Sequence, residues 1–208
     1  MKQAERYSCV NISVDDMPRG DDAVWDAAPP VHLSDTQTGE TPFLLTELRI
    51  MRCDMQEKLL VRFSGEDDEV LSIFRLHDAP LYRQDVFELF IADTDDLYAY
   101  KELESSPYDI HFDGTIIYRE PGKVLLNLDW DIKGWQSKTV LGSNRTTAVW
   151  SLPYSAFATR PKAGSSWRFN AFRVDHHSTR GISLQAWQPT LQPTFHVPDR
   201  FGYLDFVD

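Results

Sequence analysis

The chain is a long series of short segments rich in β-branched and aromatic residues, and no segment of ten residues or more keeps a helical apolar period. Turn-forming residues separate many of these segments. Many short strands spaced in this way are typical of all-β proteins, and they predict an antiparallel β-sandwich of the immunoglobulin or jelly-roll kind. The predicted strands are residues 44–53, 58–65, 69–76, 85–92, 98–105, 109–119, 123–130, 147–153, 167–175, 182–189 and 203–207.

Side-chain alternation is clearest in residues 85–92. Phe87, Leu89 and Ile91 face one way and form a wholly apolar face, whereas Glu88 and the residues two positions from it face the other way. This pattern predicts a strand with one face in the core. Hairpin turns or loops are predicted at Ser64-Gly65, Asp113-Gly114, Pro121-Gly122 and Gly142-Ser143-Asn144.

Size and charge narrow the possible functions. A chain of 208 residues without an internal repeat or a linker predicts one domain over residues 1–208. Its net charge of −11 disfavours nucleic acid and anionic membrane surfaces as partners, because both are themselves negative. No apolar run approaches the roughly 20 residues that span a bilayer. We therefore expect an acidic soluble protein with neither partner.

The N-terminal residues and the cysteines bear on the compartment. Residues 1–18 lack the apolar stretch of about 7–15 residues found in a secretory signal, so a cytoplasmic protein is the default expectation. Cys9 and Cys53 fit neither a CxxC redox motif nor a metal knuckle. Two buried free thiols are favoured, and one disulfide between them is the alternative.

Paired carboxylates are the first candidates for catalysis. Glu102 and Glu104, two residues apart on a predicted strand, face the same side. A retaining glycosidase needs its carboxyl groups about 5–5.5 Å apart across a sugar, which neighbours on one face supply only by accident. The pair is therefore interpreted as part of a solvated acidic face. Because the sequence also lacks nucleophile-elbow, phosphate-loop and dinucleotide motifs, we expect no catalysis.

Metal binding has weak signals. His176 and His177 are adjacent, so on a strand their rings point to opposite faces and do not share an ion; a strand end or loop is the expected place for them. The acidic segments Asp93–Asp96 and Asp21-Asp22 offer oxygen ligands without the EF-hand order. Solvated turns are favoured there, with structural calcium as the alternative. No cofactor is expected to be required.

Aromatic residues are abundant, and most are expected in the core because each ring buries about 150–250 Å². A ring in a loop is different, since its flat face can stack on the C–H face of a sugar. The aromatic residues that could lie in the core or stack on a sugar are Trp25, Trp130, Trp135, Trp150, Trp167, Trp187, Tyr82, Tyr98, Tyr100, Tyr118 and Phe195.

Five segments in order resemble the family 9 carbohydrate-binding modules, a β-sandwich family within the DOMON-like group that binds sugars or haem. The strongest is Leu81–Ile91, which resembles the family's aromatic-x-Q/E-D-x-x-E-x-F/I signature. The match runs over roughly residues 20 to 207, and it implies a DOMON-like sandwich that binds carbohydrate. The other segments are Val24–Ala28, Tyr98–Glu104, Trp167–Arg173 and Phe195–Gly202.

The resemblance also implies a binding site. In sugar-binding members two tryptophans clamp the terminal sugar, and Tyr82 and Phe195 stand at those positions here. Glu104 stands where such members can carry a basic residue, so the local charge is reversed. Asp85 and Asn170 are expected to hold loops through side-chain to backbone hydrogen bonds. Polar ligand contacts are carried over to Gln84, Glu88 and Gln192.

These features together predict non-catalytic binding of a mono- or oligosaccharide, with any glycoside hydrolase partner on a separate polypeptide. The DOMON-like resemblance leaves a haem-binding redox domain as the alternative, which would need a Met or His axial ligand. A hydrolase using Glu102 or Glu104 is the third reading. The candidate haem ligands are Met51, Met55, His111 and His196.

Overall fold

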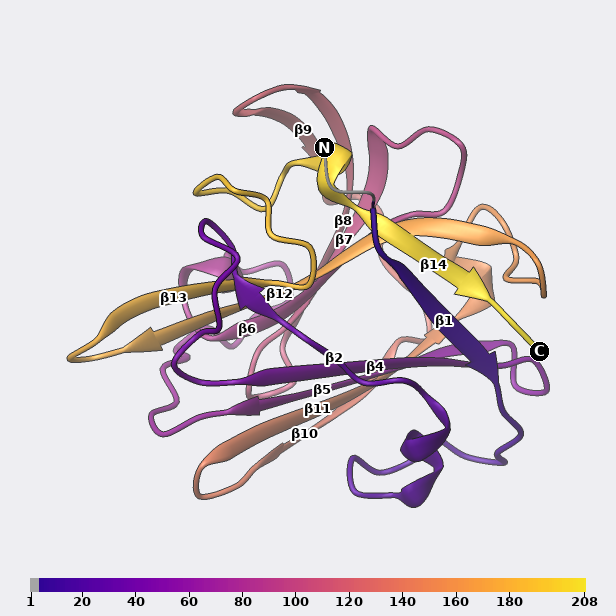
Figure 1. Ribbon diagram of the computed structural model, residues 1–208, viewed down its shortest axis with the longest axis horizontal. Coiled ribbons are helices and arrows are strands. Elements are labelled where there is room, and N and C mark those ends of the chain that lie inside the picture. Colours follow the sequence, from indigo (N-terminus) through magenta and orange to yellow (C-terminus); the bar gives the residue numbers. More distant parts are fainter. Residues whose placement is uncertain (1–3) are drawn as a thin grey trace.

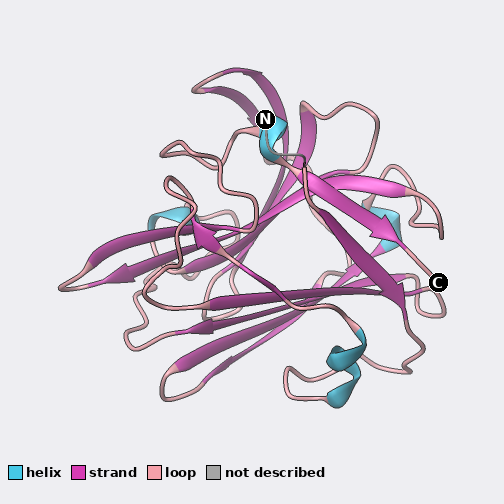
Figure 2. Cartoon of the chain, in the orientation of Figure 1, coloured by secondary structure: helices cyan, strands magenta, loops and turns pink. Residues whose placement is uncertain are grey.

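The computed structural model describes residues 4–208 and is 46% strand and 7% helix, which confirms the predicted all-β sandwich (Figure 1). Its helical parts are short 3-10 turns (Figure 2), and none of the described helices has the length and apolar character to cross a bilayer. These turns are η1 (Ala23–Ala27), η2 (Leu81–Arg83), η3 (Tyr154–Ala156) and η4 (Pro198–Arg200). The strands are β1 (Arg6–Asn11), β2 (Val31–His32), β3 (Ser34–Asp35), β4 (Thr46–Cys53), β5 (Lys58–Glu66), β6 (Val86–Ala92), β7 (Ala99–Ser105), β8 (His111–Glu120), β9 (Lys123–Asn127), β10 (Gln136–Leu141), β11 (Arg145–Pro153), β12 (Ser166–His177), β13 (Gly181–Ala186) and β14 (Gly202–Phe206).

The strands form two layers that β1 connects. Sheet A runs in the order β14-β12-β6-β7-β8-β9, with β13 paired to the second half of β12 and β3 paired to β13. Sheet B runs β10-β11-β5-β4, with β2 beside β4. The first part of β1 pairs in parallel with β14, and its last residues, Val10 and Asn11, pair in parallel with β4. All other pairings are antiparallel.

The main core lies between the two sheets and is rich in aromatic rings. As the alternation predicted, Phe87, Leu89 and Ile91 of β6 face this core. Phe63 of sheet B stacks on Phe87 with ring centroids 4.9 Å apart. Trp187 is 5% exposed and belongs to the same core, as expected. Burial of this apolar surface is the main force that joins the layers.

A second cluster covers the outer face of sheet B. Trp25 of η1 packs there with Met51, Cys53 and Leu60, and its indole N–H donates to the Arg19 carbonyl at 2.8 Å. Cys53 and Cys9 are both buried and free, and Cys9 lies in the main core instead. The favoured prediction of two buried thiols is therefore confirmed.

Some predicted elements were wrong. Residues 69–76 form no strand, because their backbone bonds side chains instead of a neighbouring strand: the Leu71 N–H donates to Asp85 and the Ile73 N–H donates to Gln84. Strands β1, β2, β3 and β10 were not predicted. Of the predicted turns, Pro121-Gly122 and Gly142–Asn144 connect strands, whereas Ser64-Gly65 lies within β5 and Asp113-Gly114 lies within β8.

The glycine in β5 makes room for a buried arginine. A Cβ on Gly65 would lie 2.5 Å from Nη1 of Arg173. Arg173 belongs to β12 in sheet A and is 2% exposed, and its Nη1 donates to the Glu66 carbonyl of sheet B at 2.6 Å. Its Nη2 pairs with Asp175 at 2.6 Å. The guanidinium therefore ties the two sheets together at one end of the core.

We expect Arg173→Met to lower the free energy of unfolding by about 3–5 kcal/mol, because it leaves a buried carboxylate without its cation. The matched control is Arg180→Met, which removes the partly exposed ion pair with Asp68 and should cost less than about 1 kcal/mol. Urea denaturation of both variants measures the difference. Equal losses would show that Arg173 is no tie between the sheets.

Candidate ligand-binding site

A cavity of about 400 Å³ lies on the outer face of sheet A, the face that points away from the main core. Strands β6 to β9 and β12 and β13 supply its floor, while η2 and the segment before η4 supply its rim. The lining residues are Tyr82, Glu88, Phe90, Glu102, Phe112, Ile116, Val124, Leu126, Val174, Leu184, Pro193, Thr194, Phe195 and His196.

The strand register places three carboxyl groups together on this face. Glu88 of β6 lies directly opposite Glu104 of β7, and Phe90 lies opposite Glu102 in the next pair on the same face. The neighbouring strands place Phe172 beside Glu88 and Phe112 beside Glu104. Acids and phenyl rings therefore sit side by side across the floor, because side chains two residues apart on a strand share a face.

All three carboxyl groups are buried. Glu88 is 1% exposed, Glu104 is 0% exposed and Glu102 is 6% exposed, and one oxygen from each lies within 4.8 Å of the others. Among residues 4–208, Oε1 of Glu88 and both oxygens of Glu104 have no hydrogen-bond partner of normal geometry. The interpretation of Glu102 and Glu104 as a solvated face was wrong. Alternation predicted their shared side, but not the chain that covers it.

Burial is the main cause of shifted acidity in the cluster. It raises the pKa of Glu102 to about 7, while a hydrogen bond with Glu104 partly opposes the rise. Burial, followed by the charges of Glu88 and Glu102, raises the pKa of Glu104 well above its usual value, although the nearby Tyr82 backbone N–H opposes it. The pKa of Glu88 is also raised, by burial and then by Glu102. The cluster therefore holds protons that exposed glutamates would release.

A glycine lies in the cavity floor beside these acids and leaves room for a neighbouring leucine. Gly114 of β8 is paired with Glu102, and a Cβ on Gly114 would lie 2.8 Å from Cδ1 of Leu126. Its missing side chain lets Leu126 of β9 close the end of the cavity. The glycine within β8 is thus a packing feature of the pocket and not the predicted turn.

The rim carries aromatic rings of different exposure. Tyr82 is 47% exposed, whereas Phe195 is half-buried and stacks on Phe172 with ring centroids 4.2 Å apart. His196 stacks on Phe90, and its Nδ1 bonds the Tyr100 hydroxyl at 2.8 Å. Burial lowers the pKa of His196 to about 4, so this ring is neutral at neutral pH. The rim therefore offers flat apolar surface and no positive charge.

The structure brings together some predicted site residues and separates others. Tyr82, Glu88 and Phe195 line one cavity, and Glu104 lies against Glu88 beneath it. Gln84 accepts from the Ile73 N–H and lies outside the lining. The exposed Gln192 also lies outside it, next to the lining residue Pro193.

The two residues expected to hold loops do so. Asp85 accepts from the backbone of Leu71 and of His176, and Asn170 exchanges two hydrogen bonds with the Gln188 backbone at 2.8 and 2.9 Å. Sequence reasoning missed Glu102, Phe90 and Phe112 as lining residues. Only the alternation around Glu88 and Glu104 could have indicated the first two.

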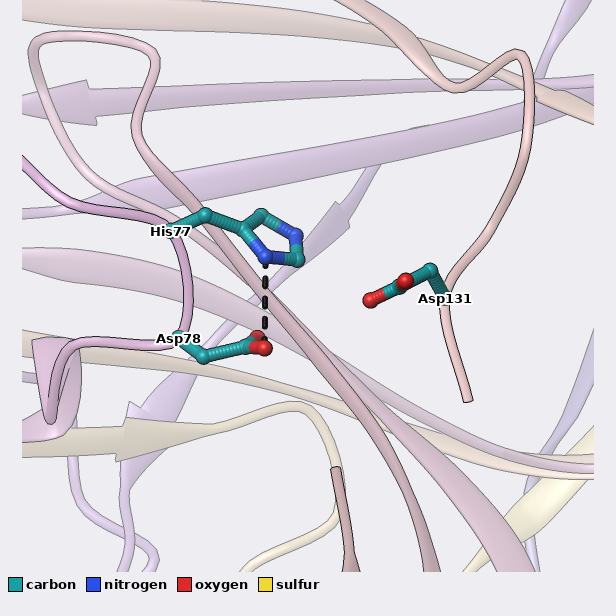
Figure 3. Close-up of side chains that lie close together, drawn as sticks. All are labelled: His77, Asp78 and Asp131. Carbon is teal, nitrogen blue, oxygen red and sulfur yellow. Dashed lines mark ion pairs between the residues drawn. The ribbon is translucent and has the colours of Figure 1, made fainter. Parts of the chain in front are cut away.

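A second acidic group, on the surface, has the composition of a metal site. His77, Asp78 and Asp131 point toward one another (Figure 3). Nδ1 of His77 faces Asp78 at 3.2 Å, and its Nε2 faces Asp113 at 2.9 Å. Because both ring nitrogens already face carboxyl oxygens of the protein, we assign no metal to this group.

The other metal and haem candidates are dispersed. The oxygens of Asp93 accept from Lys101 and from the Ala158 N–H, so Asp93 is not free to bind calcium; calcium elsewhere in the acidic segments stays a prediction. The adjacent histidines lie at the end of β12, as expected. Of the haem candidates, Met51 is buried on the outer face of sheet B, whereas His196 lies at the cavity on the outer face of sheet A. His111 stacks on Trp135 with ring centroids 4.0 Å apart, and Met55 is exposed.

Solved structures share this fold of two packed sheets. A protein from Bacteroides uniformis ATCC 8492, proposed to bind carbohydrate, matches with a TM-score of 0.77 and 15% identity over 98% of this chain and 100% of its own. A family 9 carbohydrate-binding module from Caldicellulosiruptor kristjanssonii in complex with cellotriose matches with a TM-score of 0.71 and 14% identity over 98% and 94%.

A structure of a family 9 module from the same organism in complex with glucose matches with a TM-score of 0.69 and 15% identity over 97% and 95% of the two chains. No family model matches the sequence, and no curated protein matches it either. At these identities the likeness establishes the fold, which is the one that the sequence resemblance implied.

The raised pKa of Glu102 predicts a pH-dependent stability. A buried acid whose pKa is raised binds more protons in the folded state, so its contribution falls as pH rises from the unfolded value toward about 7. Between about pH 5 and 7 the wild type should lose up to about 1.4 kcal/mol per pH unit more than Glu102→Gln, which carries no charge.

Urea denaturation across this pH range measures the difference, with Glu40→Gln as the control because Glu40 is solvent-exposed. Identical slopes for wild type and Glu102→Gln would contradict the assigned burial of the acid.

Proposed function

We propose that this protein binds carbohydrate without catalysis, and that the cavity on the outer face of sheet A is its binding site. One observation carries the proposal: an exposed ring, Tyr82, and a half-buried ring, Phe195, border a cavity whose floor presents carboxyl oxygens. Stacking surfaces beside a few convergent polar groups are the usual composition of a site for a small organic ligand. Structures of the same fold hold cellotriose and glucose.

The carboxyl arrangement supports binding over hydrolysis. Glu88 and Glu104 face each other across one strand pair, and Glu102 is next to Glu104 on the same face. A glycosidase places its two carboxyl groups on either side of the scissile bond. Here all three lie together on the floor, so none is placed opposite another across a bound sugar.

The surface next to the cavity has room for a second sugar unit. A further cavity of about 410 Å³ shares Tyr82, Val174 and Leu184 with the first and is also lined by Arg83 and His176. Tyr82 therefore stands between two adjoining hollows. This arrangement supports an oligosaccharide as ligand, with one sugar on each side of the Tyr82 ring.

The rim rings provide the test. Tyr82→Ala and Phe195→Ala should each weaken sugar binding by about 1–3 kcal/mol, the scale of a lost aromatic contact. Tyr82→Ala should change stability by less than about 1 kcal/mol because the ring is exposed, whereas Phe195→Ala should cost up to about 3 kcal/mol because it also loses its contact with Phe172. Titration calorimetry with cellotriose and thermal melting measure both effects.

Trp187→Ala is the control, since Trp187 lies in the main core and outside the cavity lining. It should lower stability by about 3–5 kcal/mol while the folded protein keeps its affinity. Unchanged affinity in stable Tyr82→Ala and Phe195→Ala proteins would refute this site.

A further inference from the structure

The buried acids of this protein fall into two groups that differ in their partners. Each buried aspartate has a donor: Asp85 bonds backbone N–H groups, Asp93 bonds Lys101 and Asp175 bonds Arg173. Asp67 accepts from Thr146, and Asp113 from Ile132. Buried acids without such partners are costly and therefore rare in folded proteins.

The three glutamates of the cavity floor are the exception. Oε1 of Glu88 and both oxygens of Glu104 lack partners although both side chains are at least 99% buried, and Glu88 lines the cavity. No ion pair among the described residues includes either of them or Glu102. Glu88 thus brings an unpartnered carboxyl oxygen to a cavity that no lysine or arginine lines.

Lys101, the basic residue next to Glu102 in the sequence, does not reach this space. Lys101 directly precedes Glu102 on β7, so its side chain points to the opposite face, where it pairs with Asp93 at 2.5 Å. Arg83 is next to Tyr82 on the rim, but it lines the adjoining cavity and not this one. A ligand that brings a positive charge into the cavity would therefore favour the ionised form of these acids, which no cationic side chain of residues 4–208 pairs with.

We infer that the ligand of this cavity carries a protonated amine, as an amino sugar does, and that its ammonium group lies against Glu88 and Glu102, with Glu104 beneath them. An ammonium group has three donors and no acceptor, which matches a floor of unpaired carboxyl oxygens. This inference rests on the proposed function, because it specifies the sugar that the same cavity would take.

The lining favours an organic cation over a metal ion. Calcium takes 6–8 oxygen ligands and magnesium an octahedral set, whereas most of this lining is hydrocarbon. The cavity of about 400 Å³ is also far larger than a bare ion. A sugar ring fills that space and presents its amine to the acids at the same time.

Titration calorimetry at pH 7 tests the inference with glucose, N-acetylglucosamine and the 2-, 3-, 4- and 6-amino-deoxyglucoses. At least one aminoglucose should bind tenfold or more tightly than glucose. Glu102→Gln, which keeps the shape of the side chain and cannot ionise, should reduce that preference to less than threefold. Glu40→Gln, at an exposed position, should leave the preference intact. N-acetylglucosamine should bind no more tightly than glucose, because its amide is neutral.

Three results would overturn the inference. If glucose binds and none of the four aminoglucoses binds more tightly, the ligand needs no amine and the proposed function stands. If calcium or magnesium chloride alone binds wild type but not Glu102→Gln, the acids serve a metal ion. If neither glucose, cellotriose nor any aminoglucose binds, the proposed function itself fails. Melting curves of each variant verify that it is folded.

Discussion

The burial of β6 on both of its faces is the constraint on which the other features depend. All seven of its residues are buried. Phe87, Leu89 and Ile91 build the main core, while Glu88 and Phe90 build the floor of the cavity. A shift of one residue in the pairing of this strand would exchange the two sets, so the core and the site are fixed by the same register.

This coupling explains how the fold tolerates an unfavourable cluster. Burial raises the pKa of all three acids, the charges of neighbouring acids raise the pKa of Glu88 and Glu104 further, and the cluster therefore reduces stability near neutral pH. The aromatic core on the opposite face of the same strands holds their backbone in place, and Arg173 ties sheet A to sheet B. Local cost at a binding site is commonly offset by packing elsewhere.

Much of the fold could be predicted from the sequence, because β-branched and aromatic residues with a period of two predict a strand. Residues 85–92 and 98–105 followed that rule closely. Residues 69–76 have the same composition but lack a neighbouring strand, since Gln84 and Asp85 capture their N–H groups. Such side-chain to backbone bonds are set by tertiary structure and leave no pattern in sequence.

The site was predictable only in part, for a related reason. Alternation showed that Glu102 and Glu104 share a side, and the family resemblance marked Tyr82, Glu88 and Phe195. Neither alternation nor the resemblance could show that the segment carrying Phe195 folds over this face and packs on it. Without that cover, the acids would be solvated and burial would not raise their pKa values.

The two faces of β7 differ in how their ionisable side chains are paired. On its inner side Lys101 meets Asp93, so charge is balanced within the protein. On its outer side Glu102 and Glu104 meet Glu88, and no cationic side chain of residues 4–208 pairs with these acids. Both arrangements arise from the same short strand, and a basic residue at position 104 would have balanced the second as well. A cation bound in the cavity would supply the partner that this outer side lacks, because Glu88 and Glu102 line that space.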